Sequence, residues 1–109
     1  MGLAATSARK YMLMARKINI QFQLQQIAQS RMRLLNVLDR VYAAAQTLEP
    51  DNPAVILQEQ FMSRLQNQDK RITLLQERLK QQMQAIDAEM QALEKILSED
   101  IKKTFGYLG

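Results

Sequence analysis

The chain of 109 residues fits one domain, with 47% apolar residues, 6% aromatic residues and a net charge of +4. Only three Gly and two Pro residues occur, which excludes collagen-like chains, β-sandwiches and β-barrels, because their many turns need both residue types. Since Cys and His are absent, thiol redox chemistry, the usual zinc sites and His-based acid–base catalysis are excluded as well. We therefore expect a chain that is not an enzyme and that has no catalytic residues, no metal site and no cofactor.

The first element is a helix over about residues 3–48, because neither Pro nor Gly interrupts this stretch. Within it, residues 18–25 alternate apolar and polar side chains, a pattern that on its own is typical of a strand. A helix is favoured because Gln is a good helix former, the flanks are strongly helical, and a lone strand would have no partner.

The same segment differs from an ordinary surface helix in its charge. No charged residue occurs between Ile18 and Ser30. On a helix, its apolar residues would be distributed around most of the circumference, and such helices are normally buried on all sides. One partner helix cannot cover that surface, so we expect a self-assembly interface between chains that contains Ile18, Ile20, Phe22, Leu24 and Ile27.

The later part of this helix carries a regular apolar stripe with Leu34, Leu38 and Val41, continued by Ala45 and Leu48. A second stripe runs beside it and consists of Met32, Leu35 and Tyr42. We expect the first stripe to face the partner helix of the same chain. The two stripes together make the apolar face of this segment wide.

The only turn signal is Pro50-Asp51-Asn52-Pro53. Proline lacks an N–H and disfavours a helical conformation in the residue before it, so the first helix has to end here. Asn52 can cap a new helix that begins with Pro53. The sequence therefore predicts a turn over residues 49–53.

The second helix is expected over about residues 53–104, with a short C-terminal tail at 106–109 in which Gly106 ends the helix as a C-cap. Its apolar stripe has a mean spacing close to 3.6 residues, which predicts a nearly straight helix, and it consists of Phe61, Leu65, Ile72, Leu75, Leu79, Met83, Ile86, Met90, Leu93, Leu97 and Ile101. The fold class is thus all-α, a long antiparallel helical hairpin that resembles a two-helix coiled coil and assembles with other subunits. Its core is expected to join Leu34, Leu38 and Val41 to Leu65, Ile72, Leu79, Ile86 and Leu93.

Charge is distributed unevenly between the two halves. Residues 1–49 contain seven Lys and Arg against two Asp and Glu, whereas residues 50–109 contain eight against nine. A hairpin folded about residue 51 places the basic cluster beside the acidic one. We expect this charge pairing to set the register, and its members are Arg9, Lys10, Arg16, Lys17, Asp87, Glu89, Glu94 and Glu99.

The sequence does not favour nucleic acid or a membrane as a partner. The net positive charge is typical of nucleic-acid binding, but the sequence contains no recognised module and no aromatic platform, so we expect no nucleic-acid partner. No run reaches the ~18 apolar residues needed to span a bilayer, so we expect no membrane partner. Arg9, Lys10, Arg16 and Lys17 interrupt the first apolar residues, which argues against a cleavable signal peptide.

The turn and the residues after it resemble the needle subunits of type III secretion systems, whose two helices join at a similar turn. The resemblance rests on Pro50-Asp51-Asn52-Pro53-Ala54-Val55-Ile56-Leu57 and on the later pattern Phe61-Met62-Ser63-Arg64-Leu65. Both helices are longer here, and the aromatic-Gly pattern near that family's N-terminus is missing. The resemblance implies a subunit that is exported without a cleaved signal peptide and that stacks into a helical homopolymer around a narrow channel.

Two functions remain in view. The first is a structural protomer of a needle- or filament-like homopolymer at the cell surface or outside the cell, whose partners are further copies and other secretion or assembly proteins. The alternative is a soluble, cytoplasmic coiled-coil adaptor or chaperone that forms closed oligomers with a protein partner. The uncharged segment from Ile18 to Ser30 favours the polymer, because an adaptor usually keeps charges on its outer side for solubility.

Overall fold

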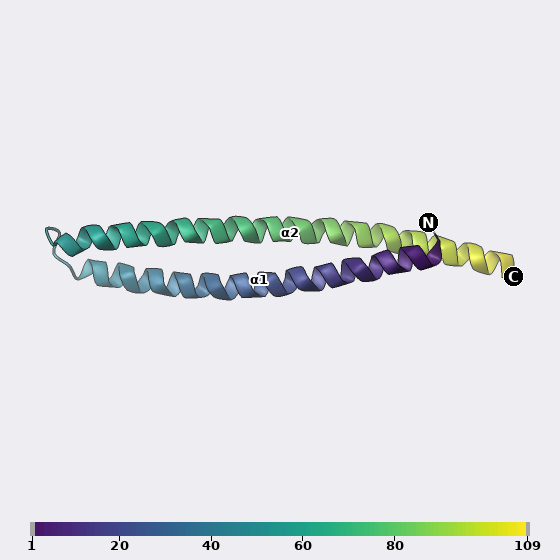
Figure 1. Ribbon diagram of the computed structural model, residues 1–109, viewed down its shortest axis with the longest axis horizontal. Helices are drawn as coiled ribbons and strands as arrows, with labels where there is room; N and C mark the ends of the chain where they lie inside the picture. Colours follow the sequence, from purple (N-terminus) through teal and green to yellow (C-terminus); the bar gives the residue numbers. More distant parts are fainter. Residues whose placement is uncertain (1, 109) are drawn as a thin grey trace. The chain divides into compact units, whose positions relative to one another are not determined.

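The chain folds into two α-helices joined by a turn. The computed structural model describes residues 2–108 and the side chains of residues 2–106, with α1 at Leu3–Gln46 and α2 at Pro53–Leu108. The expected all-α fold, a hairpin of two antiparallel helices, is confirmed (Figure 1). Residues 18–30 lie within α1, so their alternating pattern does not produce a strand.

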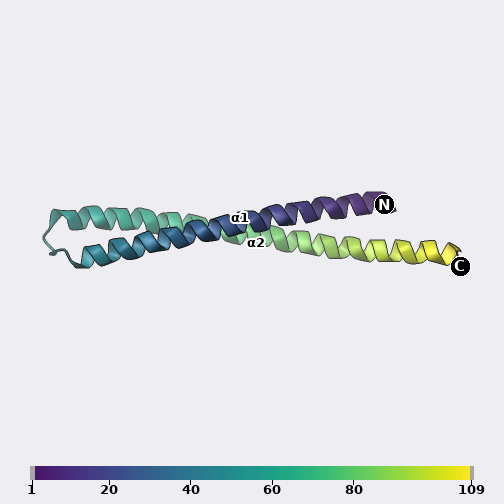
Figure 2. The same cartoon turned by 90° about the horizontal axis from the view of Figure 1, so that it is seen from below.

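The hairpin divides into two units, each a pair of antiparallel helix segments. The turn unit, Leu24–Arg78, contains the end of α1, the turn and the beginning of α2. The terminal unit combines Met1–Gln23 with Leu79–Gly109. Within the terminal unit the α1 and α2 segments run side by side in two perpendicular views (Figure 1 and Figure 2), so residues from opposite ends of the sequence pack together.

The turn is held by backbone and side-chain hydrogen bonds. The Asn52 N–H donates to the Glu49 carbonyl at 3.0 Å, and the Asn52 Oδ1 accepts from the Ala54 N–H at 3.0 Å. This second bond caps α2 at its first turn, with Pro53 as the first helical residue, as the sequence predicts. At the end of α1, the Leu48 N–H donates to the Ala45 carbonyl at 3.2 Å, which tightens the final turn.

Within each unit the two helix segments meet along a line of buried and half-buried residues, which we call the seam. In both units its positions recur at steps of three and four residues. On α1 these positions are 13, 17, 20, 24, 27, 31, 34, 38, 41 and 45, and Leu48 in the turn continues the series. On α2 they are 55, 58, 62, 65, 69, 72, 76, 79, 83, 86, 90, 93, 97 and 100.

The spacing of the seam corrects the period expected for the second helix. Phe61, Leu75 and Ile101, which the sequence analysis placed on the inward stripe, are 44%, 42% and 44% exposed. The inward positions instead repeat every seven residues, which is the 3.5-residue period of a left-handed coiled coil and not that of a straight helix. The expected spacing of 3.6 residues was wrong because it was counted from apolar residues alone, whereas several inward positions are polar, among them Gln58 and Gln76.

The best-buried part of the seam lies in the terminal unit. Leu13 of α1 is 1% exposed and packs with Ile86 and Leu93 of α2, while Ile20 and Met90 border this cluster. Thr6 is fully buried as well, and its hydroxyl donates to the Gly2 carbonyl at 3.1 Å. The chain ends are thus joined by a small apolar core although they are far apart in sequence.

The C-terminal end of α2 also differs from expectation. The helix does not stop near Thr104 but continues through Gly106 to Leu108. A glycine ends a helix by adopting a left-handed conformation, and no described glycine has a positive φ. Gly109, the last residue of the expected tail, lies outside the described residues. The last turns of α2 extend beyond the beginning of α1 (Figure 1), and residues 101–106 are all exposed.

Leu13→Ala tests whether the seam stabilises the hairpin. It removes a side chain that is 1% exposed, and a buried Leu-to-Ala change typically costs about 2–5 kcal/mol. The matched control is Leu57→Ala, because Leu57 is 68% exposed and its truncation should alter stability by less than about 0.5 kcal/mol. Urea unfolding followed by circular dichroism at one protein concentration measures both. Equal losses in the two variants would contradict the assigned seam.

Candidate self-assembly surface

Ion pairs connect the basic beginning of α1 with the acidic later part of α2. Arg9 Nη2 lies 2.8 Å from Glu89 Oε1, and Lys10 Nζ lies 3.4 Å from Glu94 Oε1. Lys17 Nζ lies 2.6 Å from Asp87 Oδ1. The structure thus brings together six of the eight residues assigned to charge pairing. All six side chains are between 31% and 55% exposed, so each pair contributes only about 0–1 kcal/mol.

The other two residues of that set do not take part. Among the described residues, neither Arg16 nor Glu99 belongs to a salt bridge. Arg16 is exposed on α1, one position before Lys17. Because neighbouring helical residues point about 100° apart, the two side chains cannot both face the same acidic residue.

A fourth ion pair, which the sequence analysis did not single out, lies on the seam of the turn unit. Arg31 Nε donates to Asp69 Oδ1 at 2.8 Å, and both residues occupy seam positions. The hydrogen bond and the negative charge of Asp69 raise the pKa of the Arg31 guanidinium above its usual value. A polar pair at a seam position specifies register, because sliding either helix would separate the charges.

The five residues assigned to self-assembly lie on two different faces of α1. Ile20, Leu24 and Ile27 are half-buried at seam positions facing α2 of the same chain. Ile18 and Phe22 are 64% and 56% exposed. The interface set is therefore corrected: the three seam residues pack within the chain, and the other two remain available to another chain. The correction follows from helix geometry, which separates residues two positions apart by about 200°.

The eight residues assigned to the hairpin core all face the partner helix. Leu34, Leu65, Leu79, Ile86 and Leu93 are buried. Leu38, Val41 and Ile72 are half-buried. In contrast, the second stripe beside them is open to solvent, since Met32 and Tyr42 are 66% and 56% exposed.

Large apolar side chains are abundant on the outer surface of both units. In the turn unit they belong to both helices and include Met32, Leu35, Tyr42, Ile56, Leu57, Phe61 and Leu74. In the terminal unit they include Leu3, Tyr11, Met12, Met14, Ile18, Phe22, Ile101 and Phe105. A single exposed Leu needs no explanation, but many together indicate a surface for association.

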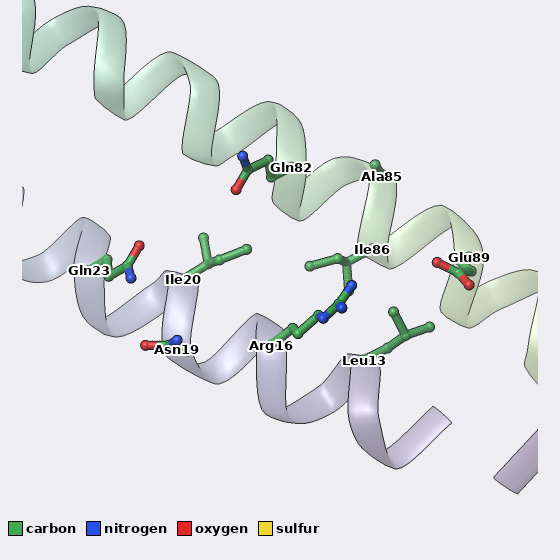
Figure 3. Close-up of a pocket in the computed structure, with 9 residues that line it drawn as sticks. All are labelled: Leu13, Arg16, Asn19, Ile20, Gln23, Gln82, Ala85, Ile86 and Glu89. Atoms are coloured by element: carbon green, nitrogen blue, oxygen red, sulfur yellow. The ribbon is translucent and has the colours of Figure 1, made fainter. Parts of the chain in front are cut away.

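A shallow groove of about 490 Å³ lies along one side of the seam in the terminal unit. Its floor is apolar, with Leu13, Ile20 and Ile86, and the Arg16 side chain extends from α1 toward α2 (Figure 3). The rim carries amides from Gln23 and Gln82, and Glu89 contributes the one carboxylate among the lining residues.

No helix in the described part of the chain has a stretch long and apolar enough to cross a bilayer. No cluster of three or more Asp and Glu residues among residues 2–108 is arranged to hold a metal ion.

Comparison with known proteins identifies no relative: the sequence matches no family model, and neither a curated protein nor a solved structure is similar to it. The likeness to type III secretion needle subunits is thus limited to the turn motif and the two-helix hairpin. No family is assigned to the chain.

Reversing one ion pair tests the register of the terminal unit. Lys17→Glu places two negative charges together and should lower stability by about 0.5 kcal/mol, whereas adding Asp87→Lys should recover most of the loss. Arg16→Glu is the matched control, and Asp87→Lys should not rescue it. The difference should shrink at high salt, because exposed charges are screened over ~8–10 Å. Urea unfolding at low and high salt measures these effects, and equal rescue of both variants would contradict the pairing.

Proposed function

We propose that this chain is the structural protomer of a helical homopolymer, a needle- or filament-like appendage or conduit outside the cell or at its surface. The observation that carries the proposal is the exposure of large apolar side chains on the outside of the hairpin, such as Tyr11, Ile18 and Phe22. A pair of helices can bury only one stripe of each helix, so the remaining apolar surface needs further copies.

The absence of charge around Ile18 and Phe22 supports the same function. Soluble monomers usually carry Lys, Arg, Asp and Glu on about 25–35% of their surface positions. The stretch from Ile18 to Ser30 has none, although most of its residues are exposed. We also propose that the chain has no catalytic role and that its principal partner is itself, with other assembly or secretion proteins as further partners.

A second candidate function is that of a coiled-coil adaptor or chaperone in closed oligomers with another protein. The end of α2 favours it, since Ile101 and Phe105 are 44% and 68% exposed and the last turns of α2 extend beyond the beginning of α1 (Figure 1). A local apolar end could seat a partner protein without polymer formation.

Sedimentation and negative-stain microscopy of the purified chain distinguish these functions. A homopolymer should sediment as a broad distribution of large species at micromolar concentration and appear as fibres of constant width. Burial of each Leu-sized side chain favours assembly by ~1.5–3 kcal/mol. A single closed oligomer would favour the adaptor, and a stable folded monomer would contradict both functions.

A further inference from the structure

The outer face of α1 in the terminal unit carries a second stripe with the spacing of a coiled coil. Its six residues follow one another at steps of four and three, are all exposed, and consist of Ala4, Ala8, Tyr11, Ala15, Ile18 and Phe22. Tyr11 and Ile18 each precede a seam residue by two positions, which places them about 200° away from the seam. We call this the outer α1 stripe. It has the spacing and composition of a helix-packing face, and all six of its residues are left exposed by the described part of the chain.

All charges of the α1 segment in this unit lie away from that stripe. Arg9, Lys10 and Lys17 reach α2 and form ion pairs there, and Arg16 extends over the groove (Figure 3). Across the six residues of the outer α1 stripe, no charge has to be desolvated when another helix covers it. The stripe can therefore be buried without the free-energy cost of desolvating charged side chains, a cost that an ordinary surface helix would incur.

The outer face of α2 in the same unit has a complementary character. Gln81, Ala85, Ala88 and Ala92 recur at steps of four, three and four residues, and all four are exposed. These four residues, which we call the outer α2 face, are uncharged, and the same steps continue to the charged Lys95 and Glu99. Three of the four are alanines, whereas the outer α1 stripe combines alanines with the large side chains of Tyr11, Ile18 and Phe22. Small residues let a neighbouring helix approach closely and leave room for large side chains of that helix.

We propose that the outer α1 stripe of one copy packs on the outer α2 face of a second copy of this chain. The proposal deepens the proposed homopolymer by naming its two surfaces. Size favours this pairing, because Tyr11, Ile18 and Phe22 of one copy meet alanines of the next.

The exposed area of the chain is large enough for this arrangement. The chain exposes 8508 Å², whereas a compact folded monomer of 12.6 kDa exposes about 6200 Å². The excess of about 2300 Å² accommodates two interfaces that each bury about 800 Å² of this chain.

Because the two surfaces lie on opposite helices, one copy can bind a neighbour on each. An interface between two different surfaces propagates into a ring or an open helical array, while a self-complementary interface closes as a dimer. The contact proposed here is therefore one that extends a polymer.

Mixing two assembly-defective variants tests the proposal. Ile18→Glu blocks the outer α1 stripe, and Ala88→Glu blocks the outer α2 face, so each should raise the concentration needed for assembly by about 100-fold or more. An equimolar mixture retains one intact contact per pair. It should give a species of about twice the 12.6 kDa monomer mass by sedimentation, and no longer polymer.

Several controls make each outcome decisive. Gln23→Glu and Gln82→Glu add the same charge to exposed positions beside the seam and should assemble as the parent chain does. Phe22→Glu and Ala92→Glu repeat the test at second positions, with circular dichroism to verify helix content. If the parent chain polymerises but Ala88→Glu and Ala92→Glu do too, or if the mixture stays monomeric, the assigned contact is wrong while the polymer stands. A monomeric parent chain would overturn the proposed function itself.

Discussion

The contact of Leu13 with Ile86 and Leu93 belongs to the seam along which the α1 and α2 segments of the terminal unit pack. Each helix of a hairpin has only one neighbour, so it can bury a single stripe of its own surface, and the remaining faces are left to solvent or to other chains. This limit explains why only six apolar side chains of the described residues are buried. It also explains why so much apolar surface remains outside.

The limit on burial also helps to explain where the charged residues lie. Near the beginning of α1, the basic residues lie where they can reach α2, and three of them form ion pairs. Such pairs add little stability, but they fix the helices in one register and leave the outer side of α1 without charge.

In the turn unit, Arg31 and Asp69 specify the register from a seam position. Gln58 lies on the same seam, and its Oε1 is buried without a hydrogen-bond partner in the described part of the chain. Polar seam positions favour specificity at some expense of stability.

The sequence predicted the fold better than the assembly surface. Two prolines around Asp51 and Asn52 and the lack of Gly between them and Leu3 were enough to place both helices and the turn, because these residues act locally. The inward face of α2 was harder to identify, since Phe61 and Leu75 are as apolar as true seam residues and only the seven-residue repeat separates them. Ile20 and Ile18 were likewise assigned to one interface, although two positions on a helix point in nearly opposite directions. Which outer faces meet between chains depends on contacts that a single chain does not contain.

The central claim is that the outer α1 stripe is covered by another copy. Because the chain has no Cys, single cysteines can report solvent access without interference. Ala15→Cys places a thiol on the outer α1 stripe, and Gln23→Cys places one beside the seam, where both parent residues are exposed within the chain. Rates of maleimide labelling should be compared between assembled protein and protein dissociated by dilution. The account predicts that assembly slows labelling at Ala15→Cys by about tenfold or more, the change expected when ~1.4 kcal/mol or more opposes access, and has little effect at Gln23→Cys. Equal labelling of Ala15→Cys in both states would contradict it.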